Sequence, residues 1–139
     1  MIVLDRKLAF CEDAGSAIEI CDVLTKDGDL IHIKRKEGGS SDLSHLFNQG
    51  ENSAIALLRD AQFRAEARKH LASFGNTAVR RIPKGKPSAG TFRVIYGIIG
   101  TFKGPVAESL PFFSQLSLAE AAKALSERGI DVCLCPITT

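Results

Sequence analysis

Three polar side chains within one apolar stretch are of the right types to act together on a phosphodiester. Residues 18–36, IEICDVLTKDGDLIHIKRK, read as two strands joined by a turn, with Asp22 near the end of the first and His32 and Lys34 on the second. A carboxylate can hold Mg²⁺ through oxygen, and the metal can acidify a water and neutralise phosphate charge. A neighbouring lysine can stabilise the charge that develops on the phosphoryl group. We therefore predict catalytic roles for Asp22, His32 and Lys34, with Asp22 and His32 binding Mg²⁺ or Mn²⁺.

The register of this hairpin decides whether the three side chains converge. A three-residue turn at 26–28 sets Asp22 opposite His32 and places Asp22, His32 and Lys34 on one face. A two-residue turn at Asp27 and Gly28 sets Asp22 opposite Ile33 and separates them. The sequence leaves both registers open. The plainer interpretation is a half-buried hairpin whose polar residues face solvent.

Cations gather in two short segments although the net charge is only +2. The segment RRIPKGK, residues 80–86, holds four cations and no acid, and KRK at 34–36 holds three more. Such clusters can contact phosphates, or they can simply be solvated surface. On the expected first helix, His45 and Gln49 are four apart and project to one side, where they contact nucleic acid or face solvent. The predicted nucleic-acid contacts are Lys36, His45, Gln49, Arg80, Arg81, Lys84 and Lys86.

The positions of strands and helices follow from hydrophobic periodicity, turn residues and caps. The expected strands cover residues 2–4, 7–10, 17–24, 29–36, 91–100 and 130–137. A first helix capped by Ser41 is expected to end near Gly50, and a second to cover 53–71, with Asp60 as a candidate cap inside it. A Gly/Pro/basic loop follows at 75–90, and a last helix begins at a Ser117 cap and stops at Gly129.

This order of elements predicts an α/β fold with a mixed β-sheet and helices on both faces. The length of 139 residues favours a single domain covering 1–139. No apolar run approaches the ~20 residues that span a bilayer, and the N-terminus does not read as a secretory signal, so we expect a cytoplasmic protein without a membrane partner. The four cysteines are expected to be reduced and buried.

The pattern "D22 … H32-I-K34" and the order of elements resemble the restriction-endonuclease-like PD-(D/E)xK nuclease superfamily. That superfamily carries an Asp on its second core strand and an acid-x-Lys pair on the third. The resemblance covers roughly 17–139 as topology and implies a metal-dependent nuclease. Two departures are plain: His32 stands at the acid position, and the chain opens on a strand where the superfamily usually has a helix with another acid. Asp5 is a candidate replacement, whereas strand parity places Glu19 on the opposite face of the strand from Asp22.

Several segments, among them LDRKLA, LSHLFNQG and LPFFSQLSLAEAAKAL, are also similar to the C-terminal part of a sporadically distributed bacterial family without settled function. This likeness implies that the domain is part of a longer protein and belongs to a mobile or defence system. We therefore predict a nucleic-acid-processing domain, a divalent-metal-dependent endonuclease acting on DNA or RNA. The alternative is a non-catalytic module that binds nucleic acid or protein on the same scaffold. A third interpretation is an assembly domain that forms a homodimer or larger assembly through strand edges or Phe112 and Phe113.

Overall fold

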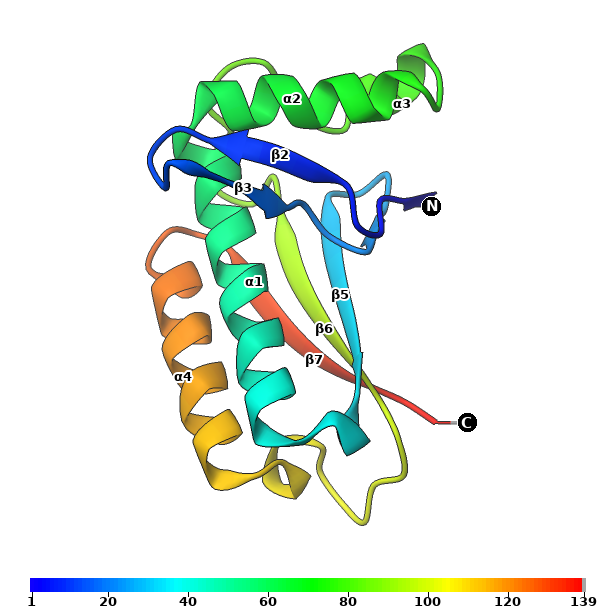
Figure 1. The fold of residues 1–139 in the computed structure, drawn as a ribbon, viewed down its shortest axis with the longest axis vertical. Helices are drawn as coiled ribbons and strands as arrows, with labels where there is room; N and C mark the ends of the chain where they lie inside the picture. Colours follow the sequence, from blue (N-terminus) through cyan, green and yellow to red (C-terminus); the bar gives the residue numbers. More distant parts are fainter. Residues whose placement is uncertain (139) are drawn as a thin grey trace.

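The fold is built around a mixed sheet, which a computed structural model describes for residues 1–138 (Figure 1). The strand order is β1-β4-β5-β6-β7, antiparallel from β1 to β5 and parallel from β5 to β7. The strands of the sheet are β1 (Ile2–Val3), β4 (Val23–Leu24), β5 (Asp29–Arg35), β6 (Arg93–Ile99) and β7 (Asp131–Ile137). The predicted α/β class and mixed sheet are therefore confirmed.

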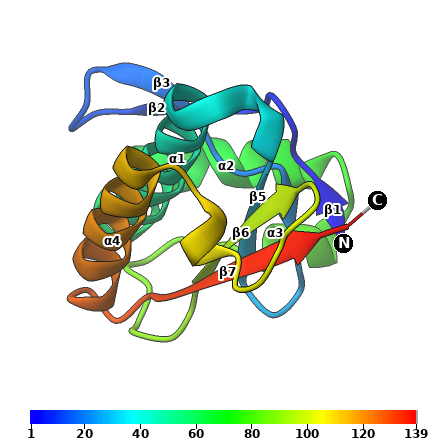
Figure 2. The same ribbon diagram turned by 90° about the horizontal axis from the view of Figure 1, so that it is seen from below.

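Two long helices cover the sheet from one side. Helix α1 (Gly39–Arg59) and helix α4 (Phe112–Ser126) lie side by side on the same face (Figures 1 and 2). The prediction of helices on both faces is wrong for these two. Parallel crossovers are right-handed, and the strand order advances in one direction from β5 to β6 to β7, so both crossovers fall on one side. On β5, Leu30 and His32 face the helices and are buried, whereas Ile31 and Ile33 face away and are half-buried.

Helix α1 runs straight through Gly50, where we had predicted its end. A Cβ at Gly50 would overlap the ring of Tyr96, so this glycine is needed for the close approach of the helix to β6. The Tyr96 hydroxyl donates to the Phe47 carbonyl at 2.7 Å, and the two rings pack edge to face. A glycine inside a helical pattern can therefore mark a close packing contact and not the end of the helix.

The other helix starts also differ from expectation. Helix α1 begins at Gly39, after a short 3₁₀ turn (Lys36–Gly38), without a side-chain cap from Ser41. Helix α4 begins at Phe112, after a second 3₁₀ turn (Ala107–Ser109), so Ser117 lies inside it and donates to the Ser44 hydroxyl of α1. Gly129 does end the last helix, with φ of 76°, as predicted.

The strand predicted at 17–24 is divided between two sheets. Its first part is β3 (Ser16–Glu19), which pairs with β2 (Leu8–Cys11) as a separate hairpin, and its last part is β4. Asp60, the N-cap of α2 (Ala61–Ala72), fixes this hairpin to the helices. Its carboxylate accepts from the N–H groups of Phe63, Glu12 and Asp13 and from the Cys11 thiol. Burial alone would raise the pKa of Asp60, but these hydrogen bonds outweigh burial and lower it.

The Gly/Pro/basic loop predicted at 75–90 is fixed by arginines from α2. It contains the short helix α3 (Asn76–Val79). Arg64 is buried and donates to the Leu57 carbonyl at 3.0 Å and to the Lys84 carbonyl at 3.2 Å. Arg68 donates to the carbonyls of Val79, at 3.0 Å, and Ile82. The backbone that carries the cations of this loop is therefore held in place beside α2.

Candidate functional site

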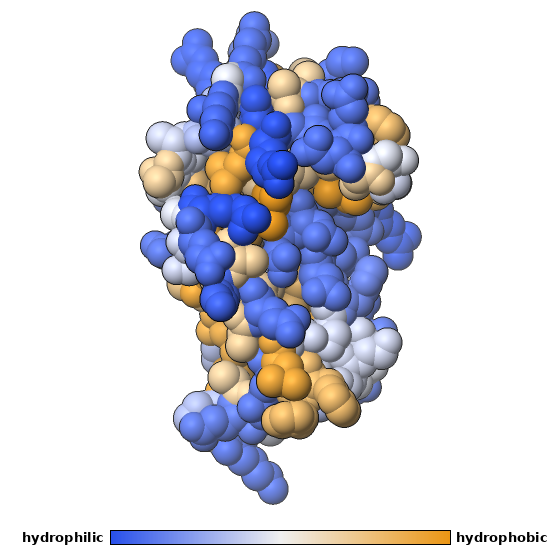
Figure 3. All heavy atoms as spheres, turned by 90° about the vertical axis from the view of Figure 1, so that its left-hand side faces the viewer, coloured by the Kyte–Doolittle hydropathy of each residue, from blue (hydrophilic) through white to orange (hydrophobic). Residues whose placement is uncertain are grey.

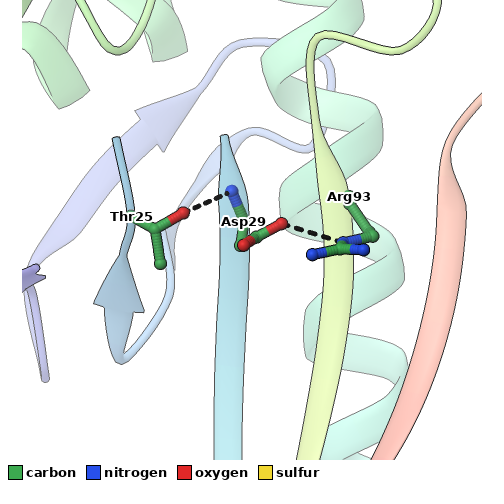
Figure 4. A network of polar contacts seen from close by, with 3 residues as sticks. All are labelled: Thr25, Asp29 and Arg93. Atoms are coloured by element: carbon green, nitrogen blue, oxygen red, sulfur yellow. Dashed lines mark hydrogen bonds and ion pairs between the residues drawn. The ribbon is translucent and has the colours of Figure 1, made fainter. Parts of the chain in front are cut away.

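The turn between β4 and β5 has three residues between Thr25 and Asp29. The Thr25 N–H donates to the Asp29 carbonyl at 3.1 Å, and the Asp29 N–H donates to Thr25 Oγ1 at 3.0 Å (Figure 4). Val23 pairs with Ile31, which is the first of the two registers considered above. The Asp29 carboxylate also forms an ion pair with Arg93 at 2.9 Å, which joins the starts of β5 and β6.

Asp22 lies at the break just before β4, and its carboxylate bonds to the backbone. Its Oδ2 accepts from the Ile33 N–H at 2.7 Å, while its own N–H donates to the Ile31 carbonyl at 2.9 Å. Asp22 and Val23 thus both face Ile31, as at a β-bulge, where simple alternation of side chains is lost. The carboxylate of Asp22 therefore stands in for a strand carbonyl at the edge of β5.

Two further acids lie near Asp22. Burial raises the pKa of Asp22 above its usual value, and the neighbouring carboxyl groups of Asp5 and Glu19 raise it further, against the hydrogen bond from Ile33. We call Asp5, Glu19 and Asp22 the acidic cluster. Strand parity predicted Glu19 on the opposite face from Asp22, but residues 20–22 are not in a strand, so the alternation of side chains does not carry over from β3 to β4. No Lys, Arg or His within residues 1–138 forms an ion pair with the cluster.

His32 is part of the core. Its side chain is 3% exposed, and its ring lies 6.0 Å from that of Tyr96, its neighbour on β6. Burial lowers the pKa of His32 to about 4, so the imidazole is neutral at pH 7. Its Nε2 has no hydrogen-bond partner in the described residues. His32 is thus a polar group held in the core beside α1.

Lys34 is exposed near the far end of β5, where it lines a recess of about 510 Å³ with Glu37 and Asp42. No hydrogen bond or ion pair joins Asp22, His32 and Lys34 anywhere in the described chain. Nor do residues 1–138 contain a group of three or more His, Cys, Asp and Glu side chains placed to hold a metal ion. Their catalytic and metal-binding roles remain predictions.

The predicted nucleic-acid contacts fall into separate places. His45 and Gln49 lie on α1 beside the hairpin, where the Gln49 amide donates to Glu19 at 3.3 Å. Lys36 follows the end of β5; its ammonium donates to the Thr101 carbonyl at 3.2 Å and lies 5.2 Å from the Phe102 ring. The loop after α3 contacts β4 beside the other end of β5, about 20 Å away along the strand. These positions do not form one site.

Three of the cations at the α2 end line one recess. A recess of about 470 Å³ has a floor of Ala61, Ala65 and Ala72 and walls of Arg68, Lys69 and Lys84. Arg80 and Lys86 are exposed on the same loop, whereas Arg81 is half-buried and donates to the Leu24 carbonyl at 2.9 Å. We define the basic surface by five residues: Arg68, Lys69, Arg80, Lys84 and Lys86.

The segment that carries this surface is strongly cationic. Residues 59–86 contain eight Lys or Arg residues and only two acids, a net charge of +6 in a chain of +2. Both acids bond to the hairpin, since Asp60 accepts from Glu12 and Glu66 accepts from the Phe10 N–H at 2.6 Å. Arg68 and Lys69, which line the recess, were not among the nucleic-acid contacts predicted from the sequence. Their signal is the i, i+4 spacing of Ala61 and Ala65, which marks the face that they border.

A different surface bears on self-association. Phe112 and Phe113 are 67% and 71% exposed, and Leu116 is also exposed. All three lie at the start of α4, and Figure 3 shows a hydrophobic patch at the lower end of its face. Of the four cysteines, Cys11 and Cys21 are buried as predicted, whereas Cys133 and Cys135 are exposed on β7, the edge strand.

Comparison with protein families places the chain. A model of the family of unknown function DUF6119 matches residues 1–138. The chain belongs to the DUF6119 family. No curated protein and no solved structure matches this DUF6119 chain. None of the helices described for it has the length and apolar character needed to cross a membrane.

Proposed function

We propose that this DUF6119 domain binds nucleic acid through phosphate contacts made by the basic surface. The observation that carries the proposal is the +6 charge of residues 59–86, whose two acids are both bonded to the hairpin. Each lysine or arginine that neutralises a phosphate releases condensed counterions, which is the main sequence-independent source of affinity for DNA and RNA. Such binding suits the mobile or defence setting, and the cytoplasmic location, that the sequence predicts.

The geometry of the basic surface supports this proposal. Alanines on the floor of the recess leave room for a sugar-phosphate backbone to approach α2 closely. Arg64 and Arg68 bond the loop backbone to the helix, so the segment that carries the cations of 80–86 is ordered before any ligand arrives. Binding then costs less ordering entropy than it would for a free loop.

A restriction-endonuclease-like scaffold is the finer part of the proposal. It is supported by the sheet, in which an antiparallel run β1-β4-β5 is followed by parallel β6 and β7. The hairpin of β2 and β3 is an insertion between the first two strands of this sheet. On this scaffold the basic surface lies beyond the starts of β5 and β6, at the α2 end (Figure 1).

Binding to a fluorescent duplex of about 20 base pairs, and to RNA of the same length, tests the proposal at about 100 mM KCl. We expect the triple variant Arg80→Ala, Lys84→Ala, Lys86→Ala to bind at least about tenfold more weakly than the unmodified chain. A matched control removes three exposed lysines elsewhere: Lys26→Ala, Lys103→Ala and Lys123→Ala. Equal losses in both triples would show that net charge, and not the basic surface, governs binding.

Phosphodiester hydrolysis is a second candidate, favoured by the electrostatics of the acidic cluster. The pKa of Asp22 is raised by burial and by the neighbouring Asp5 and Glu19, and a divalent cation would relieve this repulsion. Mg²⁺ is commonly held by one or two carboxylates, water and substrate phosphate, so this cluster suits it better than the buried imidazole of His32. Lys34 would stabilise charge on the phosphate, as its position in the motif predicts.

Incubation with linear DNA, circular DNA and RNA in Mg²⁺ and in Mn²⁺ tests this candidate. Hydrolysis by the domain predicts that Lys34→Ala abolishes cleavage while Lys26→Ala, an exposed lysine in the β4–β5 turn, leaves it unchanged. Cleavage that survives Lys34→Ala would exclude the predicted centre. A domain that binds nucleic acid with a steep salt dependence but never cleaves it would be the non-catalytic module.

A further inference from the structure

The two outer edges of the β2–β3 hairpin differ in whether their backbone groups have hydrogen-bond partners. At the outer edge of β2, Glu66 of α2 accepts from the Phe10 N–H, and His70 bonds to the Leu8 carbonyl at 2.6 Å. These two side chains are four apart on α2, so they meet alternate residues of β2 as a third strand would. One edge of the hairpin is therefore already closed by a helix.

The outer edge of β3 is open. Ile18 pairs with Ala9, and the Ile20 N–H donates to the Lys7 carbonyl, so the even residues of β3 direct their backbone groups toward β2. The N–H and C=O groups of Ala17 and Glu19 point the opposite way. No hydrogen bond reaches these four groups within residues 1–138, and no other strand pairs with β3. Four backbone groups are thus available to an added strand.

A recess beside this edge can accept a side chain. It has a volume of about 250 Å³, and α1 contributes His45, Gln49 and Asn52 to its wall. From the hairpin, Ala17, Ile18 and Glu19 complete it. A strand added to β3 would direct alternate side chains into this recess and away from it.

The acidic residues beside the β3 edge indicate what kind of strand could bind there. Glu19 belongs to the acidic cluster with Asp5 and Asp22, which has no ion-pair partner in the described chain. A second copy of the hairpin would bring two such clusters together, which like-charge repulsion disfavours. A segment that carries lysine or arginine would supply the missing countercharge. Charge therefore favours a basic strand over self-pairing.

We propose that the open edge of β3 binds an extended, basic peptide segment of a partner protein as a third strand of the hairpin. Backbone hydrogen bonds to Ala17 and Glu19 give affinity, and Glu19 with the recess on α1 selects the side chains. This site is distinct from the basic surface and does not depend on nucleic-acid binding. It would give the non-catalytic alternative a protein-binding activity.

An NMR titration of the isotopically labelled chain with a capped octapeptide of alternating lysine and valine tests the proposal. We expect the largest shifts at the amides of Ala17 and Glu19 and along the α1 wall of the recess. Ala17→Pro removes an outward N–H without removing a hydrogen bond to β2, and should weaken binding at least tenfold. The dispersion of the spectrum verifies that this variant is folded.

Charge reversal gives a second, independent readout. Glu19→Lys should weaken binding of the lysine peptide at least tenfold and confer binding of the matching glutamate–valine peptide. Glu127→Lys makes the same change at an exposed position after α4 and should alter neither. The proposal is overturned if the lysine peptide does not bind, if the shifts map to the β7 edge, or if the two charge reversals behave alike.

Discussion

The first quarter of the chain, residues 1–33, and the α2–α3 segment carry opposite charges, and their acids have different partners. Residues 1–33 contain seven acids and three cations, a net charge of −4, whereas residues 59–86 carry +6. In the first region, burial raises the pKa of Asp22, and the nearby carboxyl groups of Asp5 and Glu19 raise it further. In the second, Asp60 and Glu66 bond to the hairpin, whereas Lys69, Arg80, Lys84 and Lys86 are exposed to solvent. The placement of charge, more than the net +2, indicates where polyanions bind.

The largest effect on stability is expected at His32, which is buried in the core of the first region. Its pKa in the folded chain is about 4, below the usual 6.5, so between these values the unfolded chain binds a proton that the folded chain does not. The free energy of unfolding should therefore fall by up to about 3 kcal/mol as pH drops from 6.5 to 4. His32→Leu should flatten this window, as measured by urea unfolding at several pH values.

The same variant is informative at pH 7. Removing a buried nitrogen that lacks a partner should leave stability unchanged or raise it by about 1 kcal/mol. His70→Leu is the control: it removes the hydrogen bond to Leu8 and should leave the pH window in place. A pH dependence that survives in His32→Leu would contradict a buried, neutral imidazole.

Substitution of Arg64 tests whether nucleic-acid binding by the basic surface depends on the hydrogen bonds that hold the loop to α2. Its guanidinium donates to three carbonyls, those of Leu57, Leu58 and Lys84. Arg64→Ala should lower the free energy of unfolding by about 2 kcal/mol, because hydrogen bonds from a buried charged donor are lost. It should also weaken nucleic-acid binding, although Arg64 itself is buried. Arg59→Ala, which removes an exposed arginine of the same segment, should do neither to a comparable degree.

Substitution of Asp22 is expected to change the free energy of unfolding least, and it tests directly whether the acidic cluster is repulsive. Because its folded pKa is raised, its charged form is disfavoured in the folded chain, and this cost grows as pH rises above about 3.8. Asn can still accept from the Ile33 N–H, so Asp22→Asn should stabilise the chain at pH 7 by less than about 1 kcal/mol. Thermal melts should show no gain at pH 3, where the carboxyl is protonated in both states. A large loss at pH 7 would mean that the acidic cluster does not repel.

Much of the fold could be predicted because local patterns and global packing agree. The apolar run at 91–100 correctly predicted the strand β6, and Gly129 correctly predicted the end of α4. Gly50 misled because a helix glycine that makes room for Tyr96 looks the same in sequence as one that ends a helix. The covered face was also mispredicted, since it depends on the order of β5, β6 and β7 in the sheet, which the sequence does not state.

The candidate site was less predictable because it depends on side-chain direction at a break in a strand. Of the two registers that the sequence left open, the structure has the three-residue turn, but the bulge at Asp22 directs its carboxylate to the Ile33 N–H. The loop cations were recognisable from composition, whereas Arg68 and Lys69 required the fold to bring α2 beside that loop. Charge clusters are visible in sequence; their partners are not.

The salt dependence of nucleic-acid binding tests the central claim most directly. Plotting the logarithm of the binding constant for a duplex of about 20 base pairs against that of KCl concentration, from about 50 to 200 mM, counts the phosphates contacted. Five contacts from the basic surface predict a slope of about −4.5, and the Arg80→Ala, Lys84→Ala, Lys86→Ala variant should reduce its magnitude by about 3. A slope near zero, or the same slope in the variant, would contradict phosphate binding at this surface.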